Sequence, residues 1–355
     1  MLDKRSFGLD LLRTFAIAFV LLAHFAKIFE SVGFWGVELF FALSGYLIGK
    51  IIWKNYSANG NYSFNLVTNF WKRRWWRTIP NYWLFLLIMI GFQYIRNSNI
   101  VSNDLIIKSV FFIQNFISRE EGFYSVSWSL CIEEWFYLLF PLMLLLLSFF
   151  KLSPKITYII CITIFIFISI YIRTIFINNQ VGHSLRGITL ARLDSIVYGV
   201  AISFISMILS NKTRIINFLF LVGIVILIFC IKQVHFSEIL YDEIRSQQIY
   251  LMLTPLSFAL IIPIIEKIQM NSNQLIWFRK CVQNISLWSY SIYLSHIPVM
   301  FFSYYLTSNI RVNNTGNLAS KLIGLVFTIF ISALVYKYFE KPITDKRPKE
   351  LVFHL

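Results

Sequence analysis

The chain carries little charge. Only 14% of its 355 residues are Asp, Glu, Lys or Arg, whereas a soluble domain carries about 25%. Hydrophobic residues make up 57% of the chain, aromatic residues make up 18%, and the mean hydropathy is +0.67. This balance excludes an ordinary water-soluble domain and indicates a protein that lies mostly within a lipid bilayer.

Cysteine is also scarce. The four cysteines (Cys131, Cys161, Cys230 and Cys281) lie in or beside apolar stretches without paired spacing, so neither disulfides nor a metal site is expected. The sequence has no low-complexity tract, no recognisable soluble domain and no obvious inverted repeat. It also has no pattern of a cleaved signal peptide, because the first apolar stretch is too long and no small-residue cleavage site follows it.

Apolar stretches of about the length needed to cross a bilayer recur along the whole chain. They are residues 8–29, 34–54, 79–95, 128–150, 156–177, 190–209, 215–231, 248–266, 286–306 and 318–338. Residues 105–117 are apolar but too short to span, which favours an interfacial or re-entrant segment. The predicted fold is an all-α, polytopic bundle of about ten transmembrane helices.

The placement of basic residues gives an orientation. Lys and Arg are retained in cytoplasmic loops, and with the N-terminus inside, 20 of the 32 basic residues fall on the cytoplasmic side. Both termini are therefore predicted to be cytoplasmic, with a membrane domain at 1–345 and a short tail at 346–355. The same bias accounts for much of the net charge of +15, so no nucleic-acid partner is needed to explain it.

Ionisable residues inside the apolar stretches point to a functional path, because such groups are costly in hydrocarbon. In the first stretch, Arg13 and His24 are eleven residues apart. Three helical turns separate them by ~16 Å, so both project from nearly one face at two depths. Near the depth of His24 we expect an outer polar cluster that contains Glu38, Glu133, Glu134, Arg192 and Asp194.

A second polar group is predicted near the depth of Arg13. It contains the basic run Lys72, Arg73, Arg74 and Arg77, which leads to Pro80. Proline suits the first turn of a helix, so a helix is expected to start near Pro80. A helix N-terminus beside arginines would bind phosphate through backbone N–H groups and guanidinium contacts.

Several motifs occur in an order that resembles the acyltransferase-3 family of integral membrane acyltransferases. LDLLRTFAIAFVLLAHF carries an Arg-x10-His pattern, and GVELFFALSGYLI carries an acidic residue followed by Phe-Phe-x-x-Ser-Gly. RRWWRTIPNYW contains a basic Arg-x-x-Arg step, and SWSLCIEEWFYLLFPL is similar to a Trp-Ser-Leu-x-x-Glu-Glu box. ARLDSIVYGVAI, SYSIYLSHIPV and YFEKP complete the series. The resemblance covers nearly the full length of the chain.

The resemblance implies transfer of an acyl group, commonly acetyl from acetyl-CoA, to a hydroxyl of a carbohydrate or lipid-linked sugar. O-antigen and other exopolysaccharides are compatible acceptors, and the bacterial inner membrane is the expected location. The sequence ends soon after the tenth stretch, so a stand-alone O-acetyltransferase without a fused esterase-like domain is expected. A transporter or flippase of a glycolipid or small anion is the alternative from another class.

The residues and the resemblance together suggest a mechanism. Coenzyme A would place its phosphates on Arg73, Arg74 and Arg77, and its pantetheine arm would pass Arg13 toward His24. His24 would act as general base for the acceptor hydroxyl or form a transient acyl-histidine. Glu133 or Glu134 would orient it, and only one of the two can face a cavity because they are adjacent on a helix.

Other roles stay open for several of these residues. Arg13 could instead form a structural ion pair with Asp10, and the arginine run could simply follow the positive-inside rule. His296 could be a second acid or base, or a packing residue that satisfies the carbonyl freed by Pro298. The predicted substrate-binding residues are Glu38, Ser44, Trp128, Arg192, Asp194 and His296.

Overall fold

The computed structural model describes nine parts of the chain. They are residues 5–26, 31–59, 62–95, 101–117, 123–179, 185–236, 244–270, 275–307 and 314–351. Throughout these ranges the chain forms helices and their connections and contains no β-strand. The tail predicted at 346–355 is thus described only as far as residue 351.

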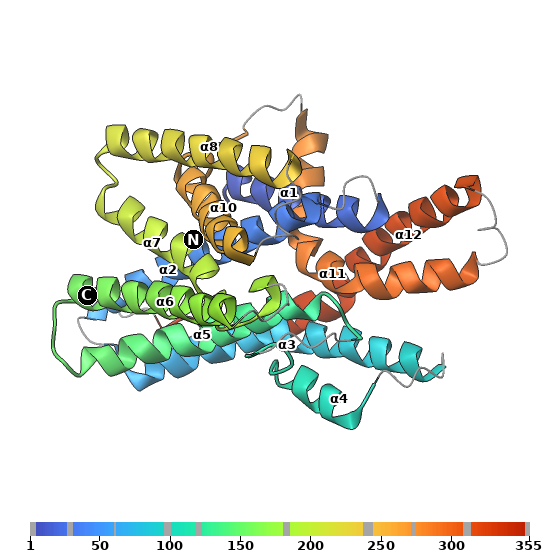
Figure 1. The fold of residues 1–355 in the computed structure, drawn as a ribbon, viewed down its shortest axis with the longest axis horizontal. Coiled ribbons are helices and arrows are strands. Elements are labelled where there is room, and N and C mark those ends of the chain that lie inside the picture. The colour runs from blue at the N-terminus through green and yellow to red at the C-terminus, as the bar shows by residue number, and fades with distance from the viewer. Residues whose placement is uncertain are drawn as a thin grey trace.

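Each of the ten predicted stretches overlaps a helix (Figure 1), and residues 27–29 of the first stretch lie outside the described residues. These are α1 (Phe7–Phe25), α2 (Val32–Asn59), α3 (Phe64–Ile95), α5 (Ser127–Ser148), α6 (Pro154–Asn178), α7 (Asp194–Ile208), α8 (Thr213–Phe236), α10 (Ile244–Ile265), α11 (Ile276–Leu306) and α12 (Asn314–Val335). Among the described residues, eight of them are long and apolar enough to cross a membrane, all but α7 and α11. The prediction of an all-α polytopic bundle is confirmed.

The outer surface of the bundle is apolar. On α8, Phe218, Leu221, Val225 and Ile228 are all exposed. On α12, Leu322, Val326 and Phe330 are exposed in the same way. Contiguous apolar surface of this extent is unfavourable in water, and on long helices it is the surface that contacts lipid.

Two helices differ from the rest in length or polarity. The 15 residues of α7 span only ~22 Å, and buried irregular backbone at 188–193 leads into the helix. Helix α11 has 31 residues but buries a row of polar side chains: Ser286, Ser289, Ser291, Ser295 and His296. Polar residues inside a bilayer face the protein interior, so α11 turns this row toward the other helices.

Residues 105–117 do not span the bundle. Helix α4 (Asn103–Val110) has eight residues, and the irregular segment after it pairs with the segment before α7. The amide of Thr189 donates to the carbonyl of Asn115 at 2.8 Å, and the amide of Leu190 donates to that of Phe116 at 3.3 Å. These hydrogen bonds satisfy backbone groups that would be costly in hydrocarbon, so the two segments support each other.

Helix α3 corrects the prediction of a helix that starts near Pro80. The helix begins at Phe64 and runs to Ile95, with Pro80 inside it. Proline removes one helical hydrogen bond but does not end a helix that neighbouring helices support. The predicted helix N-terminus beside the arginines therefore does not exist, and the basic run lies on the side of a continuous helix.

Helices α2 and α7 meet along a seam of glycines. A Cβ on Gly45 would collide with the backbone oxygen of Ile196, and one on Gly199 would collide with that of Ala42. Small residues let two helix backbones approach closely, which is how helices associate in membranes. Gly45 belongs to the Phe-Phe-x-x-Ser-Gly motif, so part of that motif serves helix packing.

Helix α1 lies between α2 and α11. Figure 1 shows α3, α5 and α6 running side by side, with α11 and α12 as a second group. The side chains of α1, α2, α3, α5 and α11 that point toward one another enclose a cavity.

Candidate functional site

The cavity brings together five of the residues predicted from the sequence. Its volume is about 840 Å³ including its opening. The wall consists of Arg13, Val37, Phe40, Phe41, Leu43, Ser44, Leu47, Ile48, Arg74, Arg77, Thr78, Ser129, Leu130, Glu133, Tyr137, Ser289, Tyr290 and Tyr293. These side chains include three guanidinium groups, of Arg13, Arg74 and Arg77, and one carboxylate, of Glu133. The wall therefore carries a net positive charge, which suits an anionic ligand.

Arg13 both lines the cavity and contacts Asp10. One guanidinium nitrogen lies 3.5 Å from a carboxylate oxygen of Asp10, which is buried and also binds Arg5 at 2.5 Å and the hydroxyl of Ser286 at 2.8 Å. The contact from Arg13 is the loosest of the three. Asp10 is thus held mainly by Arg5 and Ser286, and Arg13, which it contacts only loosely, also faces the cavity.

The arginine run of α3 divides into two groups. Arg74 and Arg77 line the cavity, and the guanidinium carbon of Arg74 lies 5.6 Å and 5.7 Å from the ring centroids of Phe70 and Tyr137. Arg73 instead donates to the carbonyl of Pro348 at 2.7 Å and lies 3.5 Å from Glu350. The structure thus places two of the three predicted phosphate ligands in the cavity wall.

The C-terminal segment adds a further cation to this region. The side chain of Asn69 donates to the carbonyl of Lys349 at 3.1 Å, which holds the segment against α3 together with Arg73. Burial and the charges of Arg73 and Arg77 lower the pKa of Arg347. The positive charge around the arginine run therefore comes from two distant parts of the sequence.

Glu133 and Glu134 point in different directions. Glu133 lies in the cavity wall and accepts a hydrogen bond of 2.7 Å from the hydroxyl of Tyr137, one turn along α5. Glu134 is buried, and it is not part of the cavity wall. Of the two carboxylates, Glu133 is the one that can reach a ligand in the cavity.

The α2 side of the cavity is built by the Phe-Phe-x-x-Ser-Gly motif. Phe40, Phe41 and Ser44 line the cavity, and Gly45 lies on the adjoining face against α7. Ser44 supplies a hydroxyl that can donate or accept a hydrogen bond. The motif therefore joins one polar contact in the cavity to the close packing behind it.

Glu38, Arg192 and Asp194 lie outside the cavity wall, in buried ion pairs. The guanidinium of Arg192 contacts the two carboxylate oxygens of Glu38 at 2.6 Å and 2.5 Å. Arg173 binds both oxygens of Asp194 at 2.9 Å and 2.6 Å, and the hydroxyl of Tyr198 donates to the same carboxylate at 3.1 Å. The four paired side chains are completely buried, so they tie helices together.

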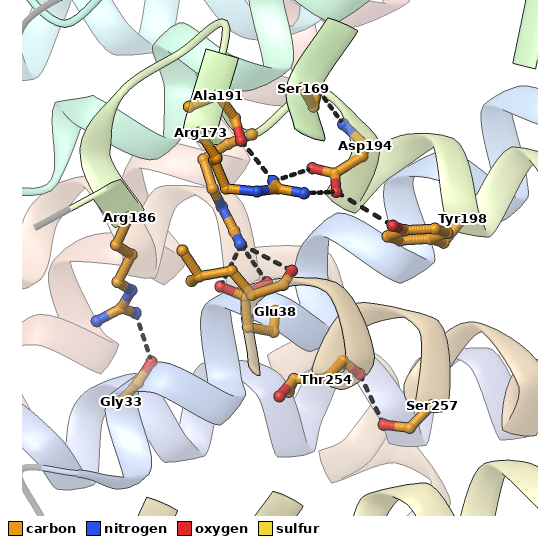
Figure 2. Close-up of polar contacts among 12 residues, drawn as sticks. Gly33, Glu38, Ser169, Arg173, Arg186, Ala191, Asp194, Tyr198, Thr254 and Ser257 are labelled. Atoms are coloured by element: carbon orange, nitrogen blue, oxygen red, sulfur yellow. Dashed lines mark hydrogen bonds and ion pairs between the residues drawn. The ribbon is translucent and has the colours of Figure 1, made fainter. Parts of the chain in front are cut away.

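Trp128 packs against a cation. Its ring lies in edge contact with Phe41, which is part of the cavity wall. The guanidinium carbon of Arg186 lies 5.0 Å from the ring of Trp128 and 5.1 Å from that of Phe34, and Arg186 also contacts the carbonyl of Gly33 at 3.5 Å (Figure 2). A cation over an aromatic face is stabilising, and Arg186 covers one face of the Trp128 ring, which was predicted to bind the substrate.

His24 and His296 lie together just beyond the cavity wall. Their ring centroids are 4.9 Å apart, and the ring of His296 is 5.7 Å from that of Tyr293, which lines the cavity. His24 is exposed, whereas His296 is completely buried. The carbonyl of Leu294, which Pro298 frees from the helix, accepts a hydrogen bond of 2.7 Å from Tyr124. His296 is therefore not needed for that carbonyl.

Sequence reasoning missed Arg173, Arg186 and Tyr293. Arg173 lies within the fifth predicted stretch, so the signal of an ionisable residue in an apolar helix was present. Arg186 lies before α7 in the short 3-10 helix η2 (Leu185–Gly187), which has three residues and too little periodicity for the sequence to give a face or a partner. Tyr293 was one of many aromatic residues until packing placed it between the cavity and His296.

Comparison with known proteins agrees with the motifs. A family model described as an acyltransferase domain matches residues 6–337. The O-acetyltransferase OatA of Staphylococcus aureus strain NCTC 8325 is 29% identical over 374 residues, which are 98% of this chain and 58% of that protein; OatA of strain COL matches equally. The chain thus spans 58% of the length of these relatives. No solved structure matches significantly. Because the family model covers nearly the whole chain, the protein belongs to the acyltransferase-3 family of integral membrane acyltransferases.

Proposed function

We propose that the chain moves an acetyl or other acyl group from cytoplasmic acyl-CoA to a hydroxyl of a cell-surface carbohydrate. The observation that carries this proposal is the cavity in which Arg13, Arg74 and Arg77 meet Glu133 and Ser44. A membrane protein has little reason to gather three arginines around an interior space unless an anion binds there. The O-acetyltransferase name of the relatives supports the same reaction class.

The donor would bind through arginine side chains, because α3 has no helix N-terminus beside the basic run. Coenzyme A carries phosphates on a thin pantetheine arm, and guanidinium groups bind phosphate by paired, charge-assisted hydrogen bonds. Arg74 and Arg77 would bind the phosphates, and Arg347 and Arg73 would add positive charge nearby. Arg13 would lie beside the arm on the way to His24.

His24 would supply the chemistry. Its imidazole would take the proton of the acceptor hydroxyl as that oxygen attacks the thioester carbon. The carbon–sulfur bond then breaks, and the leaving thiolate takes the proton from His24. An acyl-histidine intermediate remains the second route, and in both routes Glu133 would help to orient the reacting groups from the cavity wall.

The orientation follows the bias of basic residues. With both termini in the cytoplasm, the arginines of the cavity lie toward the compartment that contains acyl-CoA, and His24 lies toward the opposite side, where a surface carbohydrate would arrive. We place the protein in the bacterial inner membrane on this basis. O-antigen, exopolysaccharide or a lipid-linked sugar would provide the accepting hydroxyl.

The test is acetyl transfer in membranes. Membranes from cells that express the chain are given radiolabelled acetyl-CoA, and label in the carbohydrate fraction is counted for the native chain and for His24→Ala. We expect transfer by the native chain and a loss of at least ~100-fold in the variant. Full activity in His24→Ala would refute the role of His24. No label in carbohydrate, with movement of a glycolipid across vesicles, would favour the transporter instead.

A further inference from the structure

One ring nitrogen of His296 has a hydrogen-bond partner, and the other is unsatisfied within the described residues. Its Nδ1 lies 3.2 Å from the carbonyl oxygen of Ile292, one turn back along α11. Within the described part of the chain, its Nε2 is buried and has no hydrogen-bond partner. A carbonyl only accepts hydrogen bonds, so the proton of the neutral ring is on Nδ1 and Nε2 carries a lone pair.

A buried lone pair without a partner is costly. An unsatisfied polar atom inside a protein lowers its stability, and a catalytic role is one of the reasons for which a native structure retains such an atom. The side chain is completely buried, so water does not compensate it at the surface. The neighbouring ring is His24, with its centroid 4.9 Å away and its plane inclined at 51°.

We propose that His296 is the positioning residue for His24. Nε2 of His296 accepts a hydrogen bond from one ring nitrogen of His24, which leaves the lone pair of the other nitrogen directed at the acceptor hydroxyl. A small rotation of the exposed His24 ring converts the present ring contact into this bond. Catalytic hydrogen bonds are often long in a structure without substrate and tighten when it binds.

The pair also serves the proton transfer. When His24 takes the proton of the acceptor hydroxyl, it becomes a cation, and the lone pair of His296 stabilises it through a charge-assisted hydrogen bond. The proton then passes from His24 to the departing thiolate, and His296 keeps its own proton on Nδ1 throughout. This inference rests on the proposed function, because it needs His24 to act as the base.

Two substitutions at His296 separate positioning from packing. His296→Leu fills similar space without a lone pair, and His296→Asn retains an acceptor oxygen and an amide that can donate to Ile292. We expect His296→Leu to lower kcat roughly 10- to 100-fold, the value of one hydrogen bond to a charged group, with KM for acetyl-CoA unchanged. His296→Asn should recover at least about tenfold of this loss.

His296→Leu in a His24→Ala background completes a double-mutant cycle between the two histidines. If His296 acts through His24, His296→Leu changes the residual activity of His24→Ala by less than about twofold. Native kcat in His296→Leu, equal loss in the Leu and Asn variants, or a further large loss beside His24→Ala would overturn the proposal. Thermal unfolding of each purified variant shows whether it is folded.

A second measurement is independent of activity. Nitrogen NMR of the histidine-labelled chain reports which ring nitrogen of His296 carries the proton, with His296→Leu used for assignment. A neutral ring protonated on Nδ1 is expected, and a proton on Nε2 would overturn the proposal. Absence of transfer by the native chain would refute the proposed function itself, a result distinct from every outcome at His296.

Discussion

The buried pair between Glu38 and Arg192 allows a quantitative test of what the polar residues of α2 and α7 do. Both side chains have no exposed surface, and Arg192 also donates to the carbonyl of Leu251 at 2.9 Å. Removing one partner leaves a buried charge uncompensated, which costs about 3–5 kcal/mol. Glu38→Gln should therefore lower the unfolding temperature by several degrees, on the order of 5–10 °C for a chain of this size.

The double variant Glu38→Leu/Arg192→Met makes the test specific. Replacing both charges by apolar side chains removes the uncompensated charge, so most of the lost stability should return. The loss that remains reflects the carbonyl of Leu251, which then has no donor, at about 1–3 kcal/mol. The matched control is Asp345→Asn, which breaks the exposed pair with Lys341 and should change stability little.

The assay is thermal unfolding of the purified chain in detergent, followed by intrinsic tryptophan fluorescence, with acetyl transfer measured in parallel. We expect the stability of the variants to be lowest with one charge removed and to rise when both are removed. The reasoning is refuted if Glu38→Gln unfolds like the native chain while transfer is lost. That result would make Glu38 a substrate-binding residue, as the sequence suggested.

Three further predictions concern the cavity and the seam. Arg77→Gln should raise KM for acetyl-CoA roughly 10- to 100-fold, measured at fixed salt, and an unchanged KM would remove Arg77 from the donor site. Gly45→Leu should prevent stable folding, because the side chain would meet the backbone of α7, whereas Gly91→Ala, which has open space, should not; equal yields of folded protein would contradict this. Tyr137→Phe should lower kcat several-fold, because Glu133 loses its hydrogen bond; native kcat would exclude a role for this contact.

Sequence predicted the helices well and their ends poorly. Apolar runs identify the ten helices because a helix that crosses a bilayer needs apolar side chains over about the thickness of the hydrocarbon core. The beginning of α3 was missed because its N-terminal half contains charged residues such as Lys72 and Arg73. A hydropathy pattern assigns such residues to a loop outside the membrane. Pro80 then looked like a helix start, although tertiary contacts keep a proline-containing helix continuous.

The site was predicted in part for a similar reason. The meeting of Arg13, Arg74 and Arg77 at one depth could be anticipated, because the depth of a residue follows from its place along a spanning helix. Glu133 was predicted near His24 and instead lies with these arginines in the cavity wall. Partners across the bundle could not be anticipated. Only the folded chain shows that Arg73 binds the C-terminal segment, since depth along a helix says nothing about which neighbour a side chain meets.

The glycine seam of α2 and α7 has a consequence for motion around the cavity. With backbones in contact at Gly45 and Gly199, neither helix can slide or turn without steric overlap. The buried pair of Glu38 and Arg192 ties α2 to the residues that lead into α7. The wall that carries Ser44 is thus held in place, so any movement of the cavity wall during donor binding is expected at the helices opposite it, α3, α5 or α11.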